Sequence, residues 1–273
     1  MKLKRCVNGV MEVSPGPEMV ELPRANGVFE TILLREGAPV FFEDHWARFV
    51  RGCHWYGLAL PATPAAVQAL AITLAAENGV KTGVLRFATW VGQGGTEWRL
   101  EVTPPRLHMA RGVARLGLGP SLPSADPERP FKHLRRELWL QAVRTARASG
   151  WDDAVLLDPA GQVVETGVSN LFFVNHGCLC TPGLETGPLP GIMRGRVLAL
   201  AEERGMTAKE GHHTLADLQQ ASEIWVSNSL LGLRPVTDLS GQGFGPSFPV
   251  LQQFRTIWRE HYGWDPVVIA PVG

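Results

Sequence analysis

The sequence predicts a mixed α/β protein, and three features of the chain indicate this fold class and its division into domains. Its 273 residues suffice for two modest domains or one large one. Strand-like and helix-like segments are interspersed along the first half. Residues 120–130 hold four prolines and no apolar periodicity, so we interpret them as an interdomain connection or an exposed loop entering the site. We therefore expect a smaller domain over residues 1–119, the loop 120–130, and a larger domain over residues 131–273.

In the first half, residues 27–42 predict a β-hairpin, because two apolar, β-favouring runs flank the turn Arg35-Glu36-Gly37. From residue 43 apolar side chains recur at helical spacing, and Pro61 ends this helix. A second, alanine-rich helix is predicted over residues 64–78, with Pro64 near its start. Residues 83–92 and 97–104 predict two strands joined by a glycine-rich turn.

In the second half, a helix is predicted from about residue 133 to residue 149, closed by Gly150. Residues 152–174 predict two strands on either side of a Pro-Ala-Gly turn. Further helices are predicted over residues 192–204 and from Thr214 onward, and residues 223–228 predict a buried strand. The chain has no internal repeat.

Composition excludes several functional classes. Formal net charge is zero and the sequence pI is about 7.1, so no basic surface for nucleic acid or anionic membrane is expected. No apolar run approaches the roughly 18–20 residues of a membrane span, and none follows the N-terminal basic residues as in a signal peptide. We expect a cytoplasmic protein.

The four cysteines predict no metal site. Cys178 and Cys180 form a C-x-C, but no second pair of ligands lies at zinc spacing. We expect four reduced thiols.

Four short segments hold the candidate chemistry. Lys132, one of five lysines, opens the segment FKHLRREL, and Glu165 follows 33 residues later in VVETGVSNLFF. The segment PLPGIMR, residues 188–194, leads into a predicted helix, and Ser-Asn-Ser, residues 227–229, follows a strand. Taken singly, each fits an ordinary role, such as a solvated lysine, a surface glutamate or a loop that enters a helix.

In this order and at these spacings, the segments resemble the class IV aminotransferase family of pyridoxal-phosphate enzymes. The resemblance runs from about Gly27 to Val236. It implies the fold IV type, with a small N-terminal α/β domain, a larger C-terminal domain with a pseudo-barrel core, and the cofactor between them. It also implies a homodimer in which a loop of one subunit closes the other's site.

The resemblance assigns the two central roles to Lys132 and Glu165. Lys132 would bond covalently to the cofactor aldehyde and then move protons at the substrate's α-carbon. The apolar neighbours Phe131 and Leu134 provide a setting that lowers a lysine pKa by desolvation. Glu165 would keep the pyridine nitrogen protonated, so that the ring accepts electrons. Asn170, downstream of Glu165, is interpreted as bracing its turn by hydrogen bonding.

The remaining cofactor contacts implied by the resemblance involve the phosphate and one face of the ring. The start of a helix favours an anion, and at Met193, where many relatives have threonine, only the backbone amide donates. A guanidinium fork suits a phosphate, which is the role implied for Arg48 in HWARF. The residues assigned to the cofactor besides Lys132 and Glu165 are Arg48, Leu189, Ile192, Met193, Asn228 and Ser229.

Within the family, three local features resemble 4-amino-4-deoxychorismate lyases: KHL-x-R at residues 132–136, GIMR at 191–194, and N-S-L-x-G-x-x-P-V at 228–236. Glu137 stands where branched-chain aminotransferases typically carry tyrosine. One feature opposes this reading, because Thr96 follows the Gly-Gly turn where lyases often have an arginine suited to a substrate carboxylate. Arg86 is the candidate replacement, with Thr31 as a smaller polar contact.

The reaction implied is the release of pyruvate and 4-aminobenzoate, a step of folate biosynthesis. An aminotransferase that acts on branched-chain or D-amino acids with 2-oxoglutarate would use the same residues around the cofactor, so this alternative stays open. A non-catalytic homologue that only binds the cofactor is a third, remoter reading. In both enzyme readings the partner is a small amino-acid-like molecule.

Overall fold

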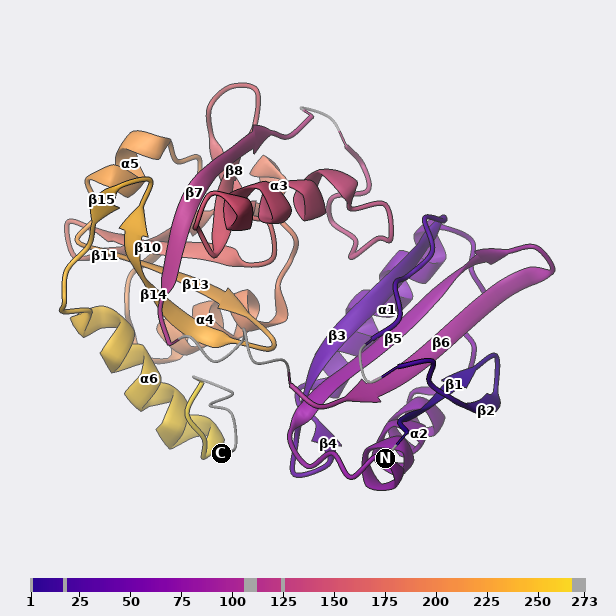
Figure 1. Ribbon diagram of the computed structural model, residues 1–273. Helices are drawn as coiled ribbons and strands as arrows, with labels where there is room; N and C mark the ends of the chain where they lie inside the picture. The colour runs from indigo at the N-terminus through magenta and orange to yellow at the C-terminus, as the bar shows by residue number, and fades with distance from the viewer. Residues whose placement is uncertain (1, 17–18, 106–111, 124–125, 267–273) are drawn as a thin grey trace. The chain divides into compact units, whose positions relative to one another are not determined.

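The computed structural model describes residues 2–16, 19–105, 112–123 and 126–266 (Figure 1). The described residues form two compact units. The first unit contains the described residues up to 105 together with Phe131–Arg135. The second contains the described residues of 112–130 and residues 136–266.

The first unit is an antiparallel sheet with two helices on one face (Figure 1). Its strand order is β2-β1-β6-β5-β3-β4. The elements are β1 (Lys4–Val7), β2 (Val10–Val13), β3 (Gly27–Arg35), β4 (Ala38–Pro39), α1 (Phe42–Trp55), α2 (Pro64–Glu77), β5 (Gly83–Gly92) and β6 (Gly95–Thr103).

Alternation along β3 sets the two faces of this sheet. Val28, Ile32 and Leu34 pack against α1 and α2 in the main core of the unit. Phe29 points to the other face and packs with Leu134 in a small separate cluster. The face of the sheet away from α1 and α2 is called the second face below.

Local sequence explains the boundaries of these elements. Glu36 and Gly37 both have positive φ, 51° and 79°, as a tight hairpin turn between β3 and β4 requires. Helix α2 begins with Pro64 after Thr63, whose hydroxyl accepts a hydrogen bond from the amide of Ala66. The predicted hairpin, helices and strand pair of this half are all present.

The second unit contains a curled sheet of nine strands. The order is β12-β11-β10-β13-β14-β7-β8-β9, with β15 paired to β14. Only residues 167–169 separate β9 from β10, although β9 ends the order and β10 lies inside it, so the sheet must curl. The strands are β7 (Ala114–Ser121), β8 (Asp153–Leu157), β9 (Val163–Thr166), β10 (Asn170–Asn175), β11 (Cys178–Pro182), β12 (Ala208–Gly211), β13 (Glu223–Asn228), β14 (Gly232–Leu239) and β15 (Gln242–Gly243).

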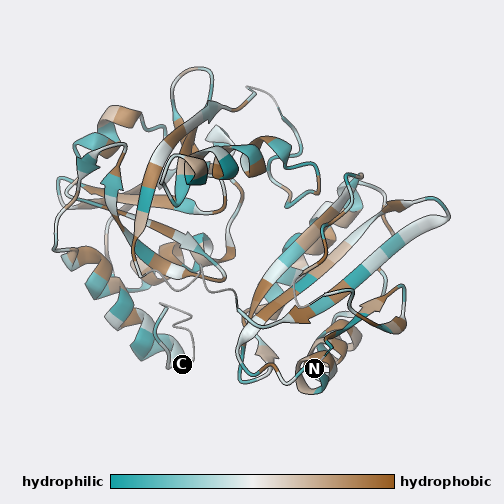
Figure 2. Ribbon diagram, viewed as in Figure 1, coloured by the Kyte–Doolittle hydropathy of each residue, from teal (hydrophilic) through white to brown (hydrophobic). Residues whose placement is uncertain are grey.

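Helix α6 of the second unit is amphipathic, and a carboxylate from another element caps its first turn. Helix α6 buries Leu251, Phe254 and Trp258 at helical spacing, and Figure 2 shows its hydrophobic and hydrophilic residues interleaved. The buried carboxylate of Glu223 accepts hydrogen bonds from the first amides of α6, at 2.8 and 3.0 Å. The helical elements are α3 (Glu137–Ala148), η2 (Leu184–Thr186), α4 (Ile192–Glu203), α5 (Leu215–Gln219) and α6 (Pro249–Tyr262).

The predicted mixed α/β class is confirmed, whereas two details differ from prediction. The helix predicted from residue 133 begins at Glu137, because residues 132–134 are extended and pair with β3. The division between units also differs from the predicted boundary at residue 119, since β7 pairs with β8 and β14 of the second unit. Within the predicted loop 120–130, residues 124–125 lie outside the described part.

Among the described residues, no helix has the length and apolarity to cross a membrane. All four cysteines are free. The described part of the chain contains no group of three or more histidine, cysteine, aspartate or glutamate side chains that could hold a metal ion.

Candidate active site

Lys132 lies in the first unit, in an extended segment that pairs with the start of β3. The amide of Phe29 donates to the carbonyl of Lys132 at 2.9 Å, and the amide of Leu134 donates to Gly27 at 2.9 Å. The Lys132 Nζ lies 4.7 Å from the centroid of the Phe29 ring. The sheet therefore fixes the backbone of Lys132, and the amine lies beside the aromatic ring of Phe29.

A buried charged cluster lies under α1 in the same unit. Arg48 donates to both oxygens of Glu30, from Nε at 2.8 Å and from Nη2 at 2.6 Å. His45 Nδ1 lies 2.6 Å from Glu30 Oε2. All three side chains are less than 5% exposed, so the cluster is closed to solvent.

Burial and neighbouring charges shift the pKa of the Glu30 carboxyl in opposite directions. Burial alone would raise the pKa of its carboxyl, but Arg48 and then His45 outweigh burial and hold the pKa at about 2. The pKa of His45 is lowered, first by burial and further by the charges of Arg48 and Lys132. Glu30 is therefore an anion and His45 is neutral at pH 7, and Lys132 is electrostatically linked to the cluster.

The contacts in this cluster bear on the phosphate-binding role predicted for Arg48. The predicted phosphate-binding guanidinium uses two of its three nitrogens on Glu30. The buried Nε2 of His45 has no hydrogen-bond partner among the described residues. Neither Glu30 nor His45 was predicted as a site residue. Glu30 precedes Thr31 in the segment FET, and His45 lies three residues before Arg48 in the segment HWAR.

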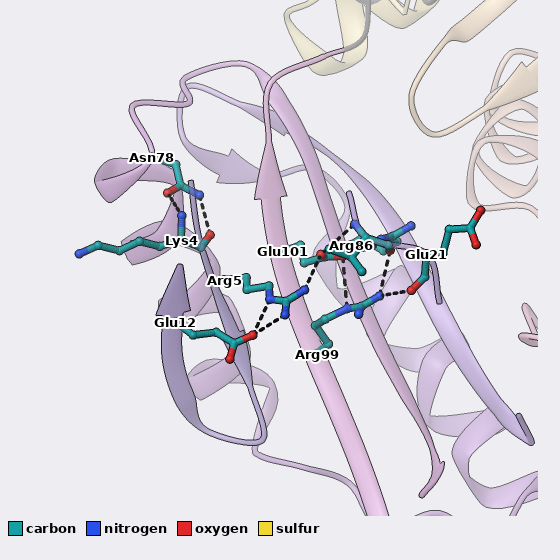
Figure 3. A network of polar contacts seen from close by, with 9 residues as sticks. Lys4, Arg5, Glu12, Glu21, Asn78, Arg86, Arg99 and Glu101 are labelled. Carbon is teal, nitrogen blue, oxygen red and sulfur yellow. Dashed lines mark hydrogen bonds and ion pairs between the residues drawn. The ribbon is translucent and has the colours of Figure 1, made fainter. Parts of the chain in front are cut away.

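On the second face of the sheet, Arg86 is part of an ionic network (Figure 3). Arg86 donates to Glu101 Oε2 from Nε at 3.2 Å and from Nη2 at 2.6 Å, and also to the carbonyl of Val20. Arg99 donates to the carbonyls of Val20 and Glu21. The network thus anchors residues 20–21 to the sheet.

Thr31 occupies the position opposite Arg86 in the β3–β5 register. Its Cα is paired with that of Arg86, so both side chains point to the same face of the sheet. The two predicted substrate contacts are therefore neighbours. The charge of Arg86 is already balanced in part by Glu101.

Glu165 lies in the second unit, near the end of β9, and is buried. Its Oε1 accepts a hydrogen bond from Trp139 Nε1 at 2.7 Å, and its Oε2 accepts from the amide of Leu189 at 3.1 Å. Arg136 Nη2 lies 3.9 Å from Oε1. Two N–H donors from separate elements therefore fix the orientation of this carboxylate. Trp139 was not predicted to take part.

The loop that ends at α4 is held from both sides. The amide of Leu189 reaches Glu165, and the Leu189 carbonyl accepts a hydrogen bond from Asn170 Nδ2 at 2.9 Å. Gly191 is the N-cap of α4 and has no side chain to cap the helix. A Cβ at Gly191 would lie 1.9 Å from Asn170 Oδ1, so only glycine fits there. This packing places Ile192 and Met193 in the first turn of α4.

Two turns of the second unit are tied together by Asn228. Its Nδ2 donates to the Val168 carbonyl at 3.3 Å and to Ser169 Oγ at 3.0 Å, in the turn after Glu165. Its Oδ1 accepts from the amides of Leu230 and Leu231, beyond Ser229. The predicted Asn228 side chain therefore braces the turn that contains Ser229.

The buried carboxyl of Asp153 holds the first of these turns from the other side. It accepts hydrogen bonds from Thr166 Oγ1 at 2.6 Å and from the amide of Gly167 at 3.0 Å. Burial raises the pKa of this carboxyl, although the hydrogen bonds counteract the rise. A Cβ at Gly167 would lie 2.7 Å from Asp153 Oδ1. Asp153 was not predicted, because an aspartate at a strand start reads as a surface residue.

The predicted residues fall into two sets, one in each unit. In the second unit, hydrogen bonds and strand pairing connect the region of Glu165 with the α4 loop and with the 229–231 turn, since Asn170 is also the register partner of Ser227. In the first unit, Lys132 is linked electrostatically to the cluster of Arg48, and Thr31 neighbours Arg86.

Comparison with known proteins identifies a family. The model of the amino-transferase class IV family matches residues 27–239 of the chain. Among solved structures, a branched-chain aminotransferase from the archaeon Thermoproteus uzoniensis, solved with norvaline, superposes with a TM-score of 0.83. It is 22% identical and the match covers 95% of this chain and 94% of that one, which shows that the fold is shared. Another solved branched-chain aminotransferase, in complex with pyridoxamine 5'-phosphate, superposes with a TM-score of 0.82 at 22% identity, covering 95% of this chain and 94% of that one.

The curated relatives include two kinds of enzyme. An aminodeoxychorismate lyase from Vibrio harveyi is 35% identical over 136 residues, which is 50% of this chain and 48% of that protein. An aminodeoxychorismate lyase from Bacillus subtilis is 26% identical, covering 80% of this chain and 79% of the relative. A D-alanine aminotransferase from Listeria monocytogenes is 28% identical, covering 79% of both chains.

Proposed function

Because the chain belongs to the class IV aminotransferase family, we propose that it is a pyridoxal-phosphate enzyme that cleaves 4-amino-4-deoxychorismate into pyruvate and 4-aminobenzoate. We choose a lyase rather than an aminotransferase mainly because of the segment KHL-x-R at residues 132–136 and the Glu137 that follows it. The 35% identity over half of the chain to a lyase supports this choice.

The residues of the second unit fit such a cofactor. The carboxylate of Glu165 is oriented by two N–H donors in a buried setting, as a group that holds the proton on a ring nitrogen requires. The first turn of α4 lacks a side-chain cap, so the amides of Ile192 and Met193 suit an anion such as a phosphate. Among the described residues, the buried Ser227 Oγ has no hydrogen-bond partner, which also suits a polar ligand.

We assign the other predicted contacts accordingly. Leu189 packs on the ring, and Ser229 donates to the phosphate from a turn that Asn228 braces. Arg48 contributes positive charge toward the phosphate through its electric field, while its Nε and Nη2 bind Glu30.

When bound, pyridoxal phosphate withdraws electrons from the substrate carbon that carries the amine. The Lys132 amine takes the proton from that carbon and returns a proton to the departing enolpyruvyl group. The ring that remains becomes aromatic, which supplies much of the driving force. The protein therefore needs mainly to orient the leaving group and to move protons.

Thr31 and Arg86 are assigned to the substrate. Their shared face and register allow a hydroxyl and a guanidinium to meet one polar group. Because Glu101 already pairs with Arg86, we assign Arg86 a weaker contact than an unpaired arginine would make.

Amine transfer to a keto acid is the second candidate. It is favoured by the 28% identity to a D-alanine aminotransferase over 231 residues. Both reactions would use Lys132 and Glu165, but in amine transfer Lys132 would deliver the proton to the cofactor rather than to a leaving group, and a keto-acid co-substrate would be required.

The test is a product assay on purified protein loaded with pyridoxal phosphate. With 4-amino-4-deoxychorismate and no keto acid, we expect equal amounts of pyruvate and 4-aminobenzoate. Lys132→Ala should abolish this release, whereas the control Lys209→Ala should preserve it. Rapid amine transfer from leucine, valine or D-alanine to 2-oxoglutarate, without pyruvate release, would identify an aminotransferase instead.

We further propose that the protein is a cytoplasmic homodimer, as the family resemblance implies. Light scattering of the purified protein should give about twice the mass of the 29.8 kDa chain. A monomeric mass would contradict this part of the proposal.

A further inference from the structure

One buried arginine of the second unit, Arg129, has no counter-ion among the described residues. It is 6% exposed. Its Nη1 donates to the carbonyl of Thr186 at 3.3 Å. Its Nε and Nη2 are both buried, and neither has a hydrogen-bond partner within the described part of the chain.

Such an arrangement is costly unless an anion completes it. A guanidinium keeps its charge at any pH at which proteins fold, and burial removes the water that would otherwise solvate it. Two other buried arginines of this protein pair with carboxylates, Arg48 with Glu30 and Arg194 with Glu210. Arg129 therefore needs a separate explanation.

The unused nitrogens define the chemistry of the missing partner. Nε and Nη2 form one edge of the guanidinium, and two parallel N–H groups on that edge match the two oxygens of a carboxylate. The same protein shows this pairing, because Arg48 binds the two oxygens of Glu30 through Nε and Nη2. A carboxylate would satisfy both unused nitrogens of Arg129 at once.

Gly187 leaves the space that the Arg129 guanidinium occupies. Gly187 has φ +91°, and a Cβ there would lie 2.6 Å from Arg129 Nη1. Any other residue at 187 would be strained and would displace the side chain. The same loop continues to Leu189, whose amide donates to Glu165. Arg129 thus lies against the loop that the proposed cofactor site uses.

We propose that Arg129 binds a carboxylate of the substrate and determines specificity for it. This inference rests on the proposed function, in which the substrate carries two carboxylates and the product 4-aminobenzoate keeps one. Both nitrogens are buried in the structure, so a ligand reaches them only after a local rearrangement.

The test compares a carboxylate with a neutral molecule of the same shape. Binding of 4-aminobenzoate and of 4-aminobenzamide to the cofactor-loaded protein is measured by calorimetry. The unaltered protein should prefer the carboxylate by ~10- to 100-fold, the range of a charge-assisted hydrogen-bonded contact. In Arg129→Met the preference should fall to about one. The control Arg144→Met, which removes an exposed arginine of α3, should leave it unchanged.

Arg129→Lys provides a second variant in case the methionine variant does not fold. It keeps the charge but loses the planar fork, so the preference should drop several-fold and stay above one. An unchanged preference in either folded variant would overturn the role of Arg129, as would equal binding of the two probes to the unaltered protein.

A parallel titration with 2-oxoglutarate separates this inference from the proposed reaction. If 2-oxoglutarate binds in an Arg129-dependent manner and 4-aminobenzoate does not bind, the lyase proposal fails and the role of Arg129 stands. If the protein releases 4-aminobenzoate from 4-amino-4-deoxychorismate but discriminates carboxylates without Arg129, the reaction stands and the inference fails.

Discussion

Replacement of Glu30 by glutamine should destabilise the first unit by about 3 kcal/mol at pH 7. The pKa of the Glu30 carboxyl falls from its ordinary value of 4.5 to about 2 in the folded chain, which corresponds to about 3 kcal/mol of stabilisation of the folded state. Loss of one partner from a buried ion pair costs about 3–5 kcal/mol in other proteins, because the remaining charge is left unpaired. The two estimates agree, since Glu30→Gln leaves Arg48 buried without its anion.

The effect should also depend on pH in a defined direction. Because folding lowers the pKa of Glu30, its contribution is complete above pH 4.5 and is lost as the pH falls toward 2. At pH 3 the difference in unfolding free energy between the two proteins should be less than about half of its value at pH 7.

The assay must report on the first unit alone, because a protein of two units need not unfold in one step. Native-state hydrogen exchange of peptides from β3 and α1 gives this free energy at pH 7, and urea unfolding gives the trend with pH. Glu77→Gln is the matched control, since Glu77 pairs with Lys4 on the exposed surface and should change stability by less than about 1 kcal/mol. An equal effect of the two substitutions, or a Glu30 effect that is as large at pH 3 as at pH 7, would refute the reasoning.

Three further substitutions test the candidate site. Glu165→Gln keeps the shape but loses the charge, so cofactor binding should persist while kcat falls by about 100-fold or more; near-normal kcat would mean that Glu165 is only structural. Asn228→Ala removes the bonds between two turns and should lower the unfolding free energy of the second unit by about 1–3 kcal/mol, measured by hydrogen exchange of β9 and β10; unchanged protection would contradict the bracing role. Arg86→Ala should raise KM only a few-fold, because Glu101 already pairs with Arg86; a rise of more than about 100-fold would mean that Arg86 holds the substrate directly.

Much of the fold could be predicted because its signals are local. The hairpin of β3 and β4 depends on a turn with two positive φ angles, and glycine at the second of them is visible in the sequence. The apolar spacing in α1 and the position of Pro64 in α2 are likewise local. The start of α3 was misplaced for the opposite reason, because residues 132–134 pair with β3 about a hundred residues earlier.

The division into compact units differs from the predicted boundary at residue 119 for a similar reason. Residues 122–123 and 126–130 lie outside helices and strands, as their proline content indicated, whereas residues 120–121 end β7. Irregularity also does not say which unit a neighbouring strand joins. Strand β7 pairs in parallel with β14, more than a hundred residues further on, and this pairing assigns it to the second unit. Such non-local pairing has no signature in composition or periodicity.

Residues of the candidate site could be predicted only where they belong to a recognisable sequence motif. Lys132 and Glu165 lie in recognisable segments, whereas Trp139 contributes to Glu165 from an ordinary amphipathic helix. The Glu30 partner of Arg48 and the buried, unused nitrogens of Arg129 depend on burial, which a single sequence does not reveal. Their discovery required the three-dimensional structure.

The central claim is that Lys132 is the lysine that holds pyridoxal phosphate, and borohydride reduction tests it most directly. Reduction of the cofactor-loaded protein followed by peptide mapping should place the cofactor mass on the peptide that contains Lys132. Addition of the substrate before reduction should lower this labelling, because the substrate amine takes the place of Lys132. Labelling of Lys81 or Lys209 instead, or no stable labelling at any lysine, would contradict the account.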